Sequence, residues 1–128
     1  MKYYIEKTAK YSFDQAIEKI TEALKKEGFG VLSEIDIHDK LKEKLDVNFR
    51  KYKILGACNP PSAYKALQIE NKIGILLPCN VIVQELGPNN VEVAVVNPVV
   101  SMQVVGNDEL EELATEIKKK LEMALDSF

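Results

Sequence analysis

Residues 54–83 constrain the fold most, because two apolar, strand-like runs in this segment each carry a Cys-Asn pair and flank one short helix. The first run ends at Cys58-Asn59 and the second contains Cys79-Asn80. A proline follows the first pair directly. Asn-Pro is a helix-start signal, since Asn caps free amides and proline loses no hydrogen bond at the first helical position. Strand, helix and strand thus follow one another here, which predicts a mixed α+β domain.

The length and charge of the chain place it among ordinary single domains. Its 128 residues suffice to bury a core without disulfides or a structural metal, so one domain over residues 1–128 is expected. The formal net charge is −3, with lysines and glutamates interspersed, which provides no basic field for phosphates or anionic lipids. Nucleic acid and membrane surfaces are therefore not expected as partners.

The sequence contains neither a signal-peptide pattern nor a membrane-span pattern. The N-terminal residues carry a charge every few positions, and no stretch reaches the roughly 18 apolar residues that a transmembrane helix needs. We therefore expect a cytoplasmic protein. Its two cysteines are expected to be reduced thiols rather than a disulfide framework, because no secretory signal accompanies them.

Hydrophobic periodicity predicts alternating strands and helices. Ser12 and Gln15 form a capping box before a helical stripe that ends where Gly28 can adopt a left-handed cap. The expected strands are 2–8, 30–36, 49–58, 73–86 and the run through Val91, Val93 and Val95, and the expected helices are 13–27, 38–46, 60–70 and one that begins at Asn107-Asp108. Residues 99–106 form a connection without an assigned structure.

These elements predict an α+β domain with a mainly antiparallel sheet of about five strands, in the order strand-helix-strand-helix-strand-helix-strand-strand-helix. The strand at 30–36 is expected beside the first strand. The first and last helices should cover one face of the sheet, and a partner subunit the other. Pro78 cannot donate to a strand ladder, so the run at 73–86 should be an edge strand or be interrupted there. Leu76 and Ile82 place apolar side chains on its second face, which predicts a homodimer.

The two thiols form the main candidate site. Alternation places Cys58 and Cys79 on the buried sides of their strands. Cys58 also directly precedes a helix start, where free amides and the helix dipole lower a thiol pKa, whereas full burial would raise it. We expect partial access at Cys58 and a faster reaction there than at Cys79. The alternative is that both are inert core residues, because free cysteine is among the most buried residue types.

Few other residues are candidates for metal binding or catalysis. Zinc favours four ligands, and only His38 and Met102 could supplement Cys58 and Cys79 within one chain, although a dimer could supply four cysteines. His38 has no nucleophile near it in the sequence and starts a helix, and the carboxylates lie mostly on predicted solvent faces. No catalytic residue is assigned, and an enzyme is the least favoured class.

Four segments together resemble a known family: 28–45, 52–67, 73–83 and the C-terminal run VGNDELEELATEIKKKLEMAL. The most specific strings are GACNP at 56–60 and LPCNV at 77–81. The family that they resemble is the uncharacterised bacterial and archaeal family called domain of unknown function three-hundred-and-two (DUF302). The resemblance implies a compact α+β fold, with an antiparallel sheet flanked by helices, and homodimers. It implies no reaction.

The leading hypothesis is a small, homodimeric binding or thiol-sensing protein. Cys58 and Cys79 would bind a soft metal ion or a small ligand, or exchange redox state. Asn59 and Asn80 would orient the bound group or form hydrogen bonds to it. The identity of the ligand, and of any cofactor, stays open. The alternative is a structural or protein-interaction module with inert cysteines and no chemistry of its own.

Overall fold

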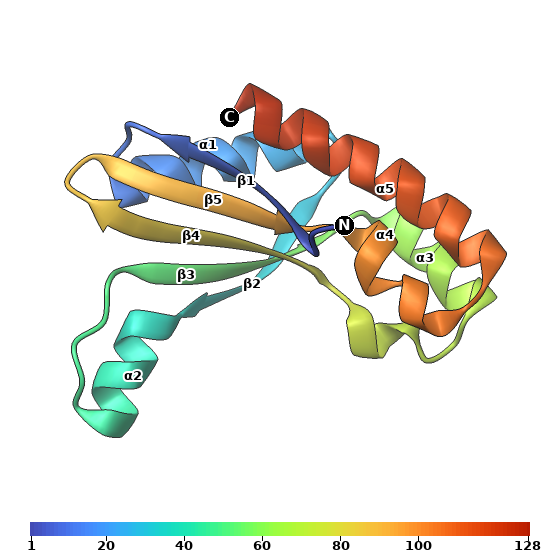
Figure 1. Cartoon of the computed structure of the whole chain (residues 1–128), viewed down its shortest axis with the longest axis horizontal. Coiled ribbons are helices and arrows are strands. Elements are labelled where there is room, and N and C mark those ends of the chain that lie inside the picture. The colour runs from blue at the N-terminus through green and yellow to red at the C-terminus, as the bar shows by residue number, and fades with distance from the viewer.

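The structure, a computed structural model, describes all 128 residues, which form one five-stranded antiparallel sheet with helices around it. The strands are β1 (Tyr4–Ala9), β2 (Gly30–Asp36), β3 (Tyr52–Cys58), β4 (Cys79–Gly87) and β5 (Asn90–Val96). The helices are α1 (Phe13–Lys26), α2 (Ile37–Leu45), α3 (Pro60–Ile69), α4 (Pro98–Ser101) and α5 (Asp108–Ser127), with short 3-10 helices η1 (Ile73–Leu76) and η2 (Gln103–Val105). The expected α+β class and element order are confirmed (Figure 1).

Side-chain caps fix the helix ends where the sequence indicates them. The backbone N–H of Gln15 donates to Ser12 Oγ, and the backbone N–H of Ser12 donates to Gln15 Oε1, both at 3.1 Å. The predicted capping box of α1 is therefore confirmed. Gly28 follows this helix with φ +85°, in the left-handed region that favours glycine. At α5, Asn107 Oδ1 accepts from two backbone amides of the first turn.

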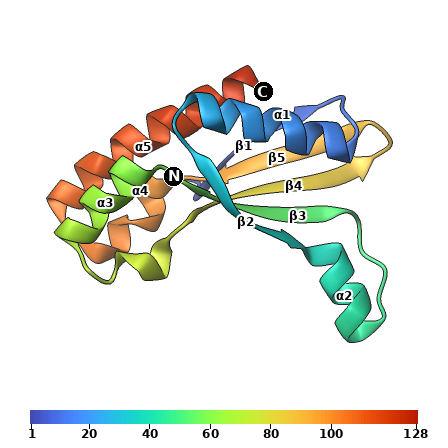
Figure 2. The same cartoon turned by 180° about the vertical axis from the view of Figure 1, so that it is seen from behind.

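Helices α1 and α5 cover one face of the sheet, as expected (Figures 1 and 2). Helix α1 packs on β4 and β5, while α5 packs on α1, β1 and β5. The predicted apolar stripe of α5 is fully buried; it comprises Leu110, Leu113, Ile117, Leu121, Ala124 and Leu125. Opposite the two helices, the core side of β4 and β5 consists of Val81, Val83, Val91, Val93 and Val95. The other face of the sheet has no helix over it.

The expectation that the first two strands are neighbours is wrong. The sheet order is β1-β5-β4-β3-β2, so β1 and β2 lie at opposite edges. Helix α1 returns the chain over one face of the sheet and packs on β5, β4 and β2, so β2 begins on the far side of β5 and β4 from β1. The place beside β1 is taken by β5, which pairs with it from Tyr4↔Val96 to Ala9↔Val91.

The buried side of β3 also differs from the expectation that its even-numbered residues face the core. Leu55 and Ala57 are buried, whereas Ile54 and Cys58 are half-buried. Lys53 lies on the same side of β3 as Leu55, so its charge made this side look solvent-facing in the sequence. Its stem lies along the core side while its ammonium group pairs with carboxylates at the edge of the sheet. Cys58 is therefore not on the core parity of its strand.

The run at 73–86 is a strand only from Cys79 onward. Residues 73–76 form the 3-10 helix η1, and Ile75, expected in the core, is 84% exposed. The predicted interruption at Pro78 is thus confirmed, but β4 is not an edge strand, since it pairs with β3 and β5. The unassigned connection 99–106 contains most of α4 and all of η2.

Helix α2 stands apart from the other helices. It projects from the sheet at the end of β2 (Figure 2) and contains no buried residue. Its last residue, Leu45, is exposed, and so are Val47 and Phe49 in the segment after it. None of the helices combines the length and apolar character that crossing a bilayer requires.

The packing of α5 predicts a large effect of Leu121→Asp. Leu121 is 0% exposed, so the substitution places an unpaired charge in the core and should lower the free energy of unfolding by about 3 kcal/mol or more. Urea denaturation followed by circular dichroism measures this change. Met123→Asp, at a 57% exposed position of the same helix, is the matched control. Equal stabilities of the two variants would contradict the assigned face.

Candidate functional site

Cys58 and Cys79 lie close together where β3 ends and β4 begins. Cys79 pairs with Ala57, the neighbour of Cys58, in the antiparallel ladder. Both cysteines line one cavity of about 320 Å³. Its other walls are mostly apolar and include Phe29, Ala63, Leu67, Leu77, Met102 and Ile117. The structure therefore places two thiols, from different strands, in the wall of one hydrophobic hollow.

Asn59 lies in the same wall, but its amide already has partners. Its Oδ1 accepts from the backbone N–H of Ser62 at 3.3 Å, which caps α3 as the Asn-Pro signal predicts. Its Nδ2 donates to the carbonyl oxygen of Glu27, at the end of α1, also at 3.3 Å. Through these two hydrogen bonds, Asn59 connects the start of α3 to the end of α1.

The two thiols differ in burial. Cys79 is 6% exposed, whereas Cys58 is half-buried. Burial, and to a smaller extent the charge of a neighbouring Cys58 thiolate, raise the pKa of Cys79 to about 11. Cys79 is therefore a protonated thiol at neutral pH, which makes it a weak nucleophile. Cys58 is the more exposed of the two thiols.

The remaining candidates from the sequence are divided among three places. Met102 lines the cavity together with Cys58 and Cys79. Asn80 is exposed on the uncovered face of the sheet, because neighbouring residues of a strand point to opposite sides. His38 lies beside Tyr52, at the other end of β3. That end is about 20 Å from Cys58 along the strand, at roughly 3.3 Å per residue.

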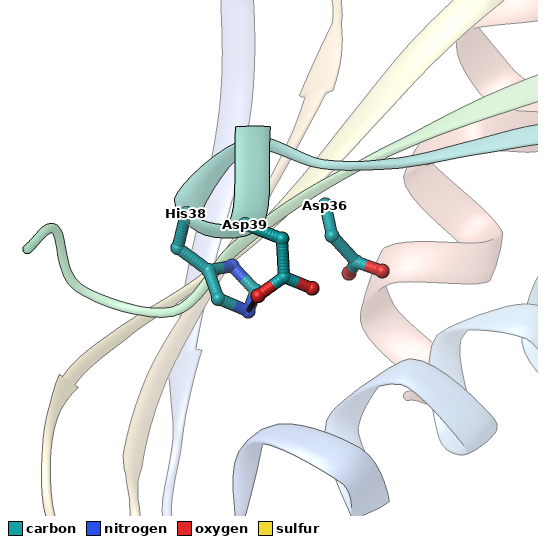
Figure 3. Close-up of side chains that lie close together, drawn as sticks. All are labelled: Asp36, His38 and Asp39. Atoms are coloured by element: carbon teal, nitrogen blue, oxygen red, sulfur yellow. Dashed lines mark ion pairs between the residues drawn. The ribbon is translucent and has the colours of Figure 1, made fainter. Parts of the chain in front are cut away.

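His38 belongs to a cluster with two carboxylates. Asp36, His38 and Asp39 each offer one ligand atom, and these three atoms lie within 4.8 Å of one another. His38 Nε2 is 3.7 Å from Asp39 Oδ1, and Figure 3 shows the three side chains projecting from the same side of the ribbon. Sequence reasoning missed the two aspartates, although the spacing D-x-H-D across a strand end and a helix start is a usable signal.

Lys53 supplies a positive charge next to this cluster. Its Nζ lies 3.3 Å from Glu34 Oε1 and 3.5 Å from Asp36 Oδ1. Burial alone would lower the pKa of Lys53, but the two carboxylates outweigh it and hold the pKa above its ordinary value. Lys53 is therefore a fixed cation that partly neutralises the acidic groups.

The uncovered face of the sheet has a hollow of about 510 Å³. Ile54, Ile82 and Ala94 form an apolar row across three strands of this face. Beside the row, Arg50 Nε donates to Gln84 Oε1 at 2.8 Å, and Gln84 Nε2 donates to Glu92 Oε1 at 2.7 Å. The face thus combines apolar side chains with charges of both signs.

Comparison with known proteins identifies the family. The family model described as "Domain of unknown function DUF302" matches residues 5–128. The chain belongs to the DUF302 family. A similar solved structure is that of an uncharacterized conserved DUF302 protein from Bacillus stearothermophilus, with a TM-score of 0.92 and 29% sequence identity, covering 99% of this chain and 98% of that chain. The chain matches no curated protein.

The two strings that carry the resemblance to DUF302 proteins meet in space. Gly56, in GACNP, lies opposite Asn80, in LPCNV, in the ladder between β3 and β4. A Cβ atom at Gly56 would lie 2.8 Å from Cγ of Pro78 and would also collide with Ser33 Oγ. Glycine is therefore required here so that the proline can pack against the strand. This packing brings Cys79 to its place beside Cys58.

Gly56→Ala should destabilise this DUF302 chain by about 1–3 kcal/mol, because the added methyl group overpacks the contact with Pro78. Thermal unfolding monitored by circular dichroism measures the change. Gly30→Ala is the control, since a Cβ at this strand position meets nothing within 4 Å. The packing argument fails if the two variants melt at the same temperature.

Proposed function

We propose that this chain is a small binding protein whose site is the cavity between β3, β4 and α3, and that the cavity takes a compact, mostly apolar ligand in contact with the Cys58 thiol. The observation that carries the proposal is the position of Cys58 and Cys79 in the wall of one hydrophobic cavity of about 320 Å³. Cavities of this size and character suit small molecules that bind by apolar burial.

The chemistry of the wall favours an apolar ligand over a metal ion. The pKa of Cys79, about 11, keeps this thiol protonated at neutral pH, so disulfide exchange is slow there and a metal ion would have to displace the proton before this sulfur could bind it. The amide of Asn59 is occupied by two hydrogen bonds within the protein. A ligand in the cavity would therefore contact mainly sulfur atoms and hydrocarbon groups. A soft ion such as Cu(I), held by Cys58, Cys79 and Met102, is the competing ligand class.

The proposal predicts unequal alkylation of the two thiols. With iodoacetamide at pH 7, Cys58 should be modified first, and Cys79 should react at an appreciable rate only as the pH approaches 11. Mass spectrometry of tryptic peptides gives both rates. Indole, as an apolar probe, should slow the modification of Cys58. Cys58→Ser should leave the melting temperature nearly unchanged, because this residue is only half-buried.

Each result of this experiment has a defined meaning. Slower reaction of Cys58 with indole present supports an apolar ligand site. If one equivalent of Cu(I) protects both thiols and indole has no effect, the ligand of the cavity is a soft metal ion and not an apolar molecule. If Cys79 is the faster thiol, or if both resist alkylation until the protein unfolds, the cavity is no binding site and the cysteines are inert.

We also propose that two copies of the chain associate through the uncovered face of the sheet. The apolar row of Ile54, Ile82 and Ala94 is only half-buried in one chain, and Ile35, which pairs with Ile54, extends the row to the edge. A two-fold interface must be complementary to itself. The presence of both charge signs beside an apolar row, as in the hollow with Arg50, meets that requirement.

The dimer proposal predicts a mass of twice 14.4 kDa in light scattering at micromolar concentration. Ile82→Lys should convert the dimer to a monomer, because it buries two like charges at the centre of the interface. Val104→Lys, at an 80% exposed position far from the sheet, should leave the mass unchanged. A monomeric wild-type chain would refute this assembly and leave the cavity proposal intact.

A further inference from the structure

Three potential metal ligands converge where β2 passes into α2 (Figure 3). One oxygen each from Asp36 and Asp39 and one ring nitrogen of His38 lie within 4.8 Å of one another. Ligands of one ion, at bond lengths of about 2.0–2.2 Å, stand roughly 3–4 Å apart. A small rotation of the Asp39 side chain, which is 73% exposed, would close the set around an ion.

The His38 ring can act as a ligand in one of its two neutral tautomers. With the proton on Nε2, the backbone N–H of Tyr52 donates to Nδ1 at 3.0 Å; with the proton on Nδ1, the ring instead faces the carbonyl oxygen of Tyr52 at 3.1 Å. When Nδ1–H donates to this carbonyl, Nε2 carries the lone pair and faces Asp39. Metal-bound histidines commonly donate their second N–H to a backbone carbonyl in this way. The edge-to-face contact with Phe13, at 5.9 Å between ring centroids, restrains the ring further.

The Asp36 side chain provides a separate indication. Asp36 occupies the N-cap position of α2, yet its carboxylate makes no capping hydrogen bond. Aspartate is among the best N-cap residues, and capping stabilises a helix by about 1 kcal/mol. Here the carboxylate turns instead toward Lys53 and toward the other two members of the cluster. The side chain is therefore available as a ligand.

Local charge favours a divalent cation. The carboxylates of Glu34, Asp36 and Asp39 face only one ammonium group in the immediate surroundings, that of Lys53. With His38 neutral, three negative charges and one positive charge leave two negative charges uncompensated. Lys53 contacts the carboxylates of Asp36 and Glu34 but not that of Asp39. The carboxylate oxygens of Asp39 are therefore not engaged by this ammonium group.

We propose that Asp36, His38 and Asp39 bind a divalent transition-metal ion such as Zn²⁺ or Co²⁺, at a site independent of the thiol cavity. One imidazole nitrogen and two carboxylate oxygens suit ions of this borderline class better than the soft ions that thiols select. Three protein ligands also leave a coordination position for water or for a group from a partner. The site lies about 20 Å from Cys58 along β3, so one ion cannot use both donor sets.

Titration of the full chain with Co²⁺, followed by calorimetry and by proton NMR, tests this site. We expect one ion per chain and paramagnetic shifts of the ring protons of His38, which is the single histidine of the sequence. Asp39→Asn and His38→Gln should each weaken binding about tenfold or more. Glu43→Gln is the matched control, because it removes the same charge from an exposed position of the same helix and should leave the affinity unchanged.

The double variant Cys58→Ser/Cys79→Ser separates this proposal from that for the cavity. Co²⁺ binding that persists in the double variant supports the assigned site, whatever the outcome of thiol alkylation. Three results would overturn the site: no Co²⁺ binding to the wild-type chain, binding unaffected by Asp39→Asn, or binding lost in the double cysteine variant. Asp39 is highly exposed, so its substitution tests the site without disturbing the core.

Discussion

The geometry of the cavity depends on the buried side chain of Asn59. Its amide joins the first turn of α3 to the carbonyl of Glu27, the C-cap residue of α1, through two hydrogen bonds, and the side chain is 7% exposed. A buried amide without partners costs about 1–3 kcal/mol, so both bonds hold the chain in this arrangement. Because Cys58 immediately precedes Asn59, the same contacts fix where β3 ends. That end, paired with β4 through Ala57 and Cys79, sets the two thiols in one wall.

Local features of the fold are readable from the sequence, and long-range ones are not. The capping box at Ser12, the cap at Asn59 and the stripe of α5 were correct because each depends on residues within a few positions. The strand order depends instead on which strands α1 packs over and on which strand pairs with β1. Lys53 shows a second difficulty. It lies on the core side of β3 but reaches an ion pair at the edge, so alternation assigns the wrong face.

The candidate site shows the same division. The sequence identifies Cys58 and Cys79 as the chemically distinctive residues, but twenty residues separate them, and only the register of β3 and β4 brings them together. Asn80, the next residue of β4, points to the opposite face of the sheet from Cys79, since side chains alternate along a strand. Asp36 was overlooked because alternation places it at the end of a strand and the carboxylates were assigned mostly to solvent faces. That its carboxylate occupies the N-cap position of α2 without capping it is visible only in three dimensions.

The two candidate binding regions occupy opposite ends of the same two elements. Helix α1 touches His38 through Phe13 at its start, and its end meets Asn59 through the Glu27 carbonyl, while β3 runs from the neighbourhood of His38 to Cys58. The donor atoms differ as much as the positions do. Sulfur in an apolar cavity suits hydrocarbon groups or, once deprotonated, soft ions, whereas carboxylate and imidazole groups near solvent suit borderline divalent ions. A metal site that combined His38 with the thiols would require β3 to be disrupted, so each ligand set is complete only within its own end of the fold.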